Sequence, residues 1–133
     1  MNGCVLDTSV LSLMYKNRPE FIPYQKFQGT KVGFISFHSI AEMRSGALYN
    51  NWGVRKSLEL EAFLRRFELV EYSSELANSW AEISSYAKRV GRRLEAGDAW
   101  VAATAQLLEI PLLTHDKDFD SIACPSITVV RFP

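Results

Sequence analysis

Short runs of apolar residues alternate along this chain with longer stretches in which apolar residues recur every three or four positions. Short apolar runs bounded by turn residues predict β-strands, and apolar residues at helical spacing predict amphipathic helices. The predicted strands cover residues 3–6, 31–36, 67–72, 111–114 and 126–131. The predicted helices cover about residues 9–15, 19–29, 37–48, 53–66, 74–90 and 94–108.

The alternation of strands and helices predicts an α/β fold. Parallel neighbouring strands need a long crossover between them, and helical crossovers cover both faces of the sheet. We therefore expect a three-layer αβα sandwich around a mostly parallel five-stranded sheet. A chain of 133 residues has the usual length of one domain, so residues 1–133 are predicted to form a single folded unit.

Four acidic residues are predicted near one edge of this sheet. Asp7 directly follows the first strand, Glu42 lies early in the helix after the second, and Asp116 comes shortly after the fourth. Asp98 faces the same way if its helix begins near that edge. Ligands of open α/β sheets bind outside the carboxyl ends of the strands. Taken singly, each acid is also explained as a helix-start residue or, for Glu42, as a solvated helix residue.

The four acids together favour a metal site. Carboxylates on one edge would repel one another unless a cation were bound between them. An all-oxygen set of ligands fits Mg²⁺ or Mn²⁺ better than zinc or copper. Because bound magnesium keeps several waters and leaves room for phosphate oxygens, the pattern predicts a site that cleaves phosphodiester bonds.

Four segments of the sequence resemble, in order, the motifs of PIN-domain nucleases. They are Val5-Leu6-Asp7-Thr8-Ser9-Val10, Ser36 with Ile40-Ala41-Glu42 and Gly46-Ala47, residues 98–105 (DAWVAATA), and residues 112–119 (LLTHDKDF). The third and fourth segments are the most specific, and the likeness covers almost the whole chain. In its length, the chain is most similar to the VapC-type toxins of prokaryotic type II toxin–antitoxin pairs.

The resemblance implies an endoribonuclease that uses Mg²⁺ or Mn²⁺. Asp7, Glu42 and Asp98 would be the core metal ligands and, with Asp116, the catalytic acids. Asp116 would be the fourth and more variable acid, and Asp118 is a competing candidate for that position.

The resemblance also implies supporting residues and partners. Thr8 and Thr114 would hydrogen-bond the ligands or the attacking water. The substrate would be tRNA, rRNA or mRNA, and the partner would be a protein antitoxin. Its C-terminal segment could bind in a groove formed by aromatic residues of the first two helices, although core packing is the alternative role for these residues. They are Tyr15, Phe21, Tyr24 and Phe27.

Charge adds one candidate surface. The chain has 15 basic and 15 acidic residues, so its net charge of zero gives no general attraction to nucleic acid. The dense basic cluster is Lys88, Arg89, Arg92 and Arg93, shortly before Asp98. It could hold RNA backbone phosphates, complement the dipole of the preceding helix, or bind an acidic partner segment, and the sequence leaves these three open.

The remaining features suggest a cytoplasmic protein. Cys4 and Cys124 are expected to be packed thiols rather than a disulfide. The first residues do not form a secretion signal, and no stretch approaches the roughly 18 apolar residues needed to span a membrane. Tyr49 and Trp52 are candidates for a homodimer surface. His115 and Lys117, which flank Asp116, are predicted to face solvent, with contact to substrate as the alternative.

Two other functions remain open on the sequence alone. One is a PIN-like protein that binds a partner and has lost catalysis, although the presence of all four acids counts against it. The other is a metal-dependent phosphohydrolase of small phosphate esters. Asp7-Thr8-Ser9 lacks the second aspartate that an aspartyl-phosphate phosphatase needs, and no phosphate-binding glycine loop occurs.

Overall fold

A computed structural model describes residues 2–121 and 126–133 of the chain. Its centre is a five-stranded sheet in the order β3-β2-β1-β4-β5, in which all neighbouring strands run parallel. The strands are β1 (Gly3–Leu6), β2 (Val32–Ser36), β3 (Glu68–Val70), β4 (Leu112–Leu113) and β5 (Val129–Val130). The predicted α/β fold with a parallel five-stranded sheet is therefore confirmed.

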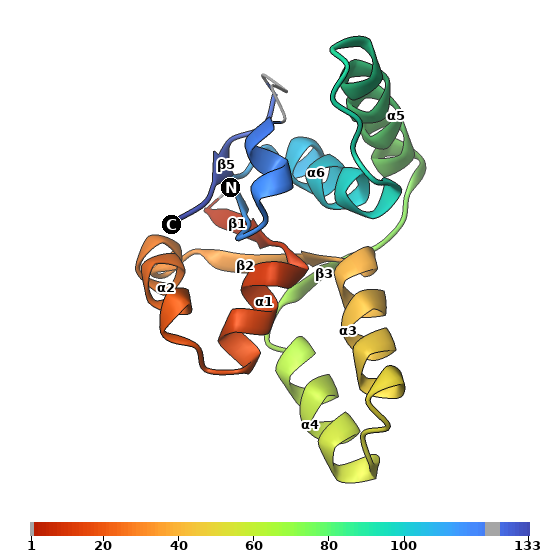
Figure 1. Cartoon of the computed structure of the whole chain (residues 1–133). Coiled ribbons are helices and arrows are strands. Elements are labelled where there is room, and N and C mark those ends of the chain that lie inside the picture. Colours follow the sequence, from red (N-terminus) through yellow and green to blue (C-terminus); the bar gives the residue numbers. More distant parts are fainter. Residues whose placement is uncertain (1, 122–125) are drawn as a thin grey trace.

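Helices cover both faces of this sheet (Figure 1). The first four lie on one side, and α5 and α6 lie on the other. The helices are α1 (Thr8–Tyr15), α2 (Ile22–Gln28), α3 (Phe37–Tyr49), α4 (Val54–Leu64), α5 (Ser74–Arg89) and α6 (Ala96–Leu108). Two short 3-10 helices, η1 (Pro19–Phe21) and η2 (Lys117–Ser121), precede α2 and follow β4.

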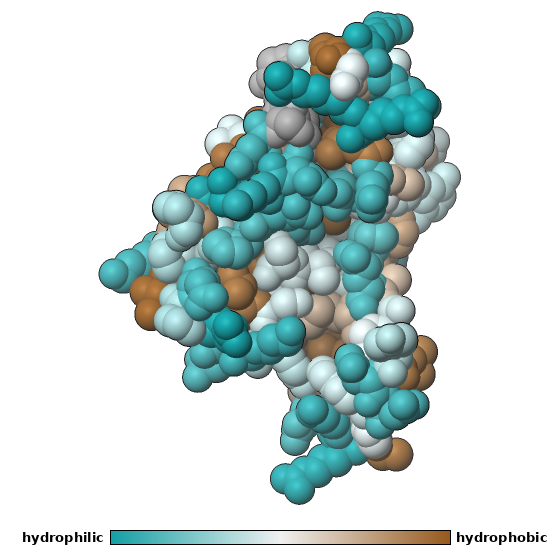
Figure 2. Space-filling model, viewed as in Figure 1, coloured by the Kyte–Doolittle hydropathy of each residue, from teal (hydrophilic) through white to brown (hydrophobic). Residues whose placement is uncertain are grey.

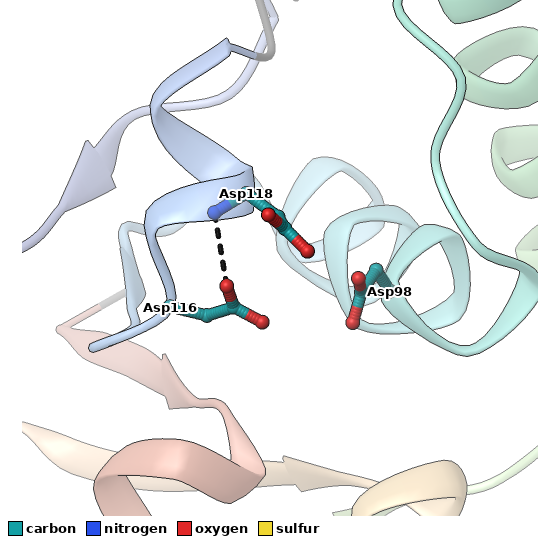
Figure 3. Close-up of side chains that lie close together, drawn as sticks. All are labelled: Asp98, Asp116 and Asp118. Atoms are coloured by element: carbon teal, nitrogen blue, oxygen red, sulfur yellow. Dashed lines mark hydrogen bonds between the residues drawn. The ribbon is translucent and has the colours of Figure 1, made fainter.

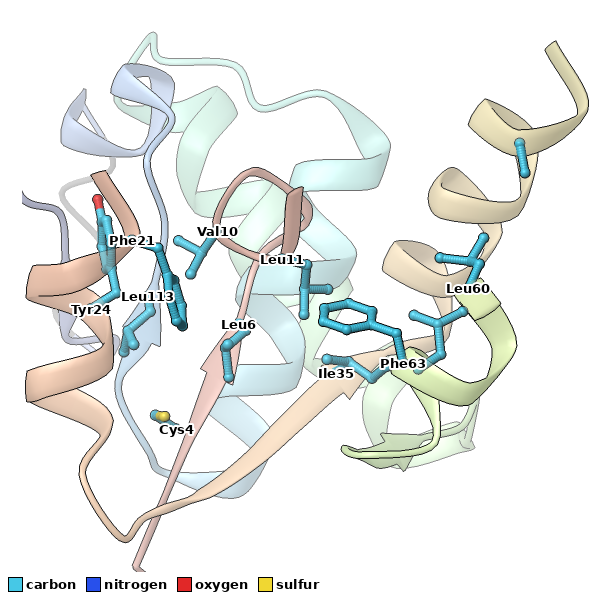
Figure 4. Close-up of a cluster of buried hydrophobic side chains, with 12 residues drawn as sticks. Cys4, Leu6, Val10, Leu11, Phe21, Tyr24, Ile35, Leu60, Phe63 and Leu113 are labelled. Atoms are coloured by element: carbon cyan, nitrogen blue, oxygen red, sulfur yellow. The ribbon is translucent and has the colours of Figure 1, made fainter. Parts of the chain in front are cut away.

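The central strand β1 is buried on both of its faces. Cys4 and Leu6 pack into one hydrophobic cluster with residues of α1, α2, α3 and α4, shown in Figure 4. Val5 points the other way and packs with residues of α5 and α6. Because side chains alternate along a strand, a continuous apolar run was needed to fill both layers, and GCVL supplies it.

Hydroxyl side chains set the start of two helices. Ser36 accepts a hydrogen bond from the amide of His38 at the start of α3, and Ser73 accepts one from Leu76 at the start of α5. At the other end of α5, Gly91 adopts a positive φ of 73°, which a residue with a side chain rarely adopts. The chain turns there and returns toward α6 (Figure 1).

Several predicted strands are shorter in the structure than in the sequence analysis. The run at 126–131 contributes only two residues to β5, because β5 pairs with β4 alone and only across Leu112–Val129 and Leu113–Val130. Cys4 is a buried free thiol, and burial raises its pKa to about 11. Cys124 lies outside the described residues. Among the helices of the described chain, none is long and apolar enough to cross a membrane.

Candidate active site

The parallel sheet brings the ends of β1, β2 and β4 to one edge, and acidic side chains follow each of them. Asp7 comes directly after β1, at the start of α1. Its side chain is only 5% exposed and makes no capping hydrogen bond to the helix. Its carboxylate Oδ2 instead accepts hydrogen bonds from Ser9 Oγ and Thr114 Oγ1, each at 2.8 Å. Asp7 is therefore held in place by hydroxyl groups rather than used as a helix cap.

Ser9 and Thr114 connect two loops that are far apart in the sequence. Thr114 Oγ1 accepts a hydrogen bond from the amide of Asp116, and Ser9 Oγ accepts one from the amide of His115. The position of Asp116 is thus tied to that of Asp7. Ser9 was not among the site residues predicted from the sequence, although its position two residues after Asp7 could have indicated a role in holding that carboxylate.

Burial and hydrogen bonding act on Asp7 in opposite directions. Burial disfavours its charged form and raises the pKa of the carboxyl above its usual value. The hydrogen bonds from Ser9 and Thr114 favour the charged form and partly offset this effect. Glu42 adds a smaller repulsion in the direction of burial. The pKa of the Asp7 carboxyl therefore stays raised, although the two hydroxyl groups stabilise its charged form.

Glu42 projects from α3 and is more exposed than Asp7. Its Oε1 accepts a hydrogen bond from Thr8 Oγ1 at 2.7 Å and lies 3.2 Å from His38 Nε2. His38 in turn lies against Gly97, where any side chain would collide with the imidazole ring. The absence of a side chain at Gly97 therefore allows His38 to reach Glu42. Neither residue was predicted from the sequence, because their contact depends on how α3 and α6 pack.

Three aspartates gather opposite the ends of the strands. Asp98 lies in the first turn of α6, and Asp116 and Asp118 lie in the loop after β4 and at the start of η2. One carboxylate oxygen from each of them lies within 4.8 Å of the others. Figure 3 shows the three carboxylates directed toward a common space. The structure therefore brings both Asp116 and Asp118 to the site, instead of selecting one of them.

The surroundings of Asp98 are strongly acidic. Burial, followed by the charges of Asp7, Asp116, Glu95 and Glu42, raises the pKa of its carboxyl to about 7. Asp7 and Glu42 are thus close enough to repel Asp98, although they lie outside the tight group of three aspartates. The surface over η2 is correspondingly hydrophilic (Figure 2). A group of carboxylates alone, in which the pKa values of Asp7 and Asp98 are raised, is a donor set that suits a hard divalent cation such as Mg²⁺ or Mn²⁺.

The basic cluster lies apart from the acids. Lys88 and Arg89 end α5, and Arg92 and Arg93 follow in its connection to α6; all four are exposed. The end of α5 points away from the sheet (Figure 1). The chain that follows the cluster leads into α6, which carries Asp98 in its first turn.

The prediction that His115 faces solvent is wrong. Its ring is half-buried, and Nδ1 lies 2.7 Å from the hydroxyl of Tyr24. Tyr24 also donates to the carbonyl of Thr114, so this tyrosine supports the loop that carries Asp116. Tyr49 is 86% exposed, whereas Trp52 stacks on Tyr15.

The chain matches known proteins over most of its length. A family model described as PIN domain matches residues 4–124. The chain is 29% identical to Ribonuclease VapC4 of Mycobacterium tuberculosis over 126 residues, covering 93% of this chain and 92% of the relative. It is 26% identical to Ribonuclease VapC1 of Haemophilus influenzae over 121 residues, covering 89% and 90% of the two chains.

Solved structures show the same fold. A chain of VapBC2 from Rickettsia felis, bound to a promoter DNA fragment, superposes with a TM-score of 0.83 at 18% identity and covers 98% of each chain. A chain of FitAB bound to an IR36 DNA fragment superposes with a TM-score of 0.80 at 26% identity, covering 96% of this chain and 94% of the other.

Proposed function

The chain belongs to the PIN-domain family, and from this premise we propose that it is a metal-dependent endoribonuclease of the VapC type. In this proposal it acts as the toxin of a toxin–antitoxin pair and hydrolyses RNA phosphodiester bonds with Mg²⁺ or Mn²⁺. The proposal that the chain hydrolyses RNA is supported by relatives that are named ribonucleases and that align with about nine-tenths of this chain. We further propose that residues 1–133 act as one domain.

The observation that carries the proposal is the convergence of Asp98, Asp116 and Asp118. Their oxygens lie within 4.8 Å of one another, with Asp7 and Glu42 near enough to raise the pKa of Asp98. A cation between them would remove the repulsion and keep all of them ionised at neutral pH. The three aspartates would hold the ion, with Asp7 and Glu42 completing its surroundings.

The chain's own residues prepare this site for phosphodiester hydrolysis. Such an ion supplies a Lewis acid that activates water and neutralises charge on the phosphate oxygens. Ser9 and Thr114 fix the Asp7 carboxylate, and Thr8 fixes that of Glu42. Because several acids lie close together, none of them is singled out as the base that would accept the proton of the attacking water.

A groove beside Glu42 suits an antitoxin segment. It lies among α1, α3 and α4, has a volume of about 160 Å³, and extends from Thr8 and Glu42 to Trp52 and Leu60. Of the four aromatic residues considered in the sequence, only Tyr15 lines it; Phe21 and Tyr24 are buried in the core. Solved neighbours described as VapBC and FitAB complexes support such a partner. A segment placed there would cover Glu42 and block the site.

The test is RNA cleavage by the purified chain. Mixed tRNA and rRNA would be incubated with Mg²⁺ or Mn²⁺, with EDTA, and with the variant Asp98→Asn. Glu75→Gln is the matched control, because Glu75 is an exposed acid on α5 outside the site. We expect metal-dependent cutting that Glu75→Gln retains and that Asp98→Asn loses by about 10²–10³-fold or more.

Other outcomes would contradict the proposal in different ways. Cleavage that survives both Asp7→Asn and Asp98→Asn would show that these acids are not the catalytic site. Turnover of a phosphomonoester with RNA left intact would indicate a small-molecule phosphohydrolase. A chain that binds no divalent metal and cuts no RNA, yet purifies with a small protein, would indicate a partner-binding module.

A further inference from the structure

A crevice runs along α5, on the side that faces the connection to α6. Its volume is about 260 Å³, and it is lined by Trp80, Ser84, Lys88, Arg93, Leu94 and Ala96. The first three are spaced four residues apart, so they lie along one face of α5. The turn at Gly91 brings the connection back along that face to form the other wall.

The two ends of the crevice differ in chemistry. Lys88 and Arg93 are exposed and place two cations at the outer end. Trp80 is half-buried at the inner end, where its indole N–H donates to the carbonyl of Ala96 at 3.1 Å and its ring packs against Trp100 with centroids 5.6 Å apart. The aromatic ring is therefore held in a fixed position, and the cations lie about two helical turns away from it.

The cations at this crevice take part in no ion pair with another described residue, since none of the ion pairs in that part of the chain includes Lys88, Arg89 or Arg93. Exposed cations without intramolecular partners attract a polyanion, even though the chain as a whole has no net charge. A polyanion with flat, apolar groups would also use the ring of Trp80, which an acidic peptide segment would not need.

The crevice is connected to the acidic site through one helical turn. Ala96 lines the crevice, and Asp98 in the same turn of α6 belongs to the group of three aspartates. Side chains two residues apart on a helix point in different directions, so the two sites lie on different sides of that turn. A polymer that passes the start of α6 could therefore occupy both sites at once.

We propose that this crevice binds one unpaired nucleotide of a single-stranded RNA, with the base against Trp80 and the backbone phosphates at Lys88 and Arg93. This inference rests on the proposed ribonuclease function and names its substrate class. Only an unpaired base is free to leave its stack and enter, so the crevice selects single-stranded segments over duplex RNA. The bond to be cut would then lie beside the bound nucleotide, at the aspartates.

Binding to the full chain in EDTA, where RNA stays intact, tests the inference. The probes are a fluorescent eight-nucleotide oligouridylate, a duplex of the same length, and a poly-glutamate peptide. Lys88→Gln with Arg93→Gln removes the phosphate contacts, and Ser84→Leu fills the crevice without changing charge or Trp80. Lys26→Gln with Arg65→Gln removes two exposed charges elsewhere and is the matched control. Circular dichroism checks that each variant is folded.

We expect Ser84→Leu to weaken oligouridylate binding on the order of tenfold without changing its salt dependence. The double variant at Lys88 and Arg93 should weaken binding similarly and reduce the slope of log K against log salt by about 1.4, for two phosphate contacts. The control variant should stay close to wild type, and Ser84→Leu should change duplex binding little.

Three results would overturn the inference. If Ser84→Leu binds oligouridylate as tightly as wild type does, no base enters the crevice and the inference is wrong. The ribonuclease proposal would still stand in that case if wild type cleaves RNA. If poly-glutamate binds as tightly as oligouridylate and loses affinity equally in the variants, the crevice binds an acidic protein segment instead. If wild type neither binds nor cuts RNA, both proposals fail together.

Discussion

Asp7 and Asp98 show two different environments in which this chain holds a carboxylate, the first almost fully buried and the second only partly buried. Burial is the main reason that the pKa of each is raised. Around Asp7, the next strongest influences are hydrogen bonds from Ser9 and Thr114, which favour its charge. Around Asp98, they are other carboxylates, which oppose its charge and bring its pKa to about 7. Hydrogen bonds within the fold stabilise the charge of Asp7, whereas the charge of Asp98 is opposed by neighbouring carboxylates.

Removing the hydroxyl support of Asp7 should have the largest effect on stability. Thr114→Val keeps the shape of the side chain but leaves the buried carboxylate with one hydroxyl fewer and the amide of Asp116 without its acceptor. We expect the free energy of unfolding to fall by about 1–3 kcal/mol, measured by urea denaturation without metal.

Thr104→Val is the matched control for this substitution. Thr104 is also fully buried, but its hydroxyl bonds only to the carbonyl of Trp100 within its own helix. Its removal should cost well under about 1 kcal/mol. Equal losses in the two variants would show that the hydroxyl of Thr114 gives Asp7 no special support.

Removing the charge of Asp98 should instead stabilise the metal-free chain. The folded chain holds the Asp98 proton up to about pH 7, whereas an unfolded chain releases it near the ordinary aspartate pKa of 3.8. Between these pH values the folded state binds more protons, so its stability falls as pH rises. The half-exposed position weakens the effect through solvent screening, to about 1–2 kcal/mol.

Thermal unfolding in EDTA at several pH values measures this contribution. Wild type should lose stability relative to Asp98→Asn between about pH 4 and 7, and the difference should stay constant above that range. A difference that does not change with pH would show that Asp98 does not carry the repulsion inferred for it.

The smallest effect on stability should come from substituting Gly97, against which His38 packs. Gly97→Ala would collide with the imidazole, whereas Gly46→Ala on α3 would meet no neighbouring atom within 4 Å. Alanine is the better helix former, so Gly46→Ala should gain about 0.5–1 kcal/mol of stability, and Gly97→Ala should lose a similar amount. Denaturant titration of both variants measures the contrast, and an equal gain in both would show that His38 moves away freely.

The sequence predicted most of the fold because its signals are local. The continuous apolar run 3–6 and the polar residues after it identified β1 and Asp7, and apolar residues at helical spacing over 74–90 identified α5. Periodicity and spacing were sufficient for the helices and strands, because these need only neighbouring residues. The resemblance of the third and fourth motifs to those of PIN-domain nucleases pointed to Asp98, Asp116 and Asp118.

What the sequence could not predict depends on contacts between distant residues. His115 was assigned to solvent because its partner, Tyr24, lies 91 positions earlier. The contact of His38 with Gly97 depends on the packing of α3 against α6, and the crevice depends on the path of the chain after Gly91. The length of β5 depends on how far β4 extends beside it. None of these leaves a pattern in a short window of sequence.

The most direct test of a cation among these carboxylates is thermal unfolding with and without Mn²⁺ at pH 7.5, in wild type and in Asp98→Asn. A ligand that binds only the folded state raises the unfolding temperature as its concentration exceeds the dissociation constant. We predict a clear rise in wild type, and little or none in Asp98→Asn, whose metal-free stability is already higher. An unfolding temperature of wild type that Mn²⁺ and Mg²⁺ leave unchanged, or an equal rise in both chains, would contradict the metal site.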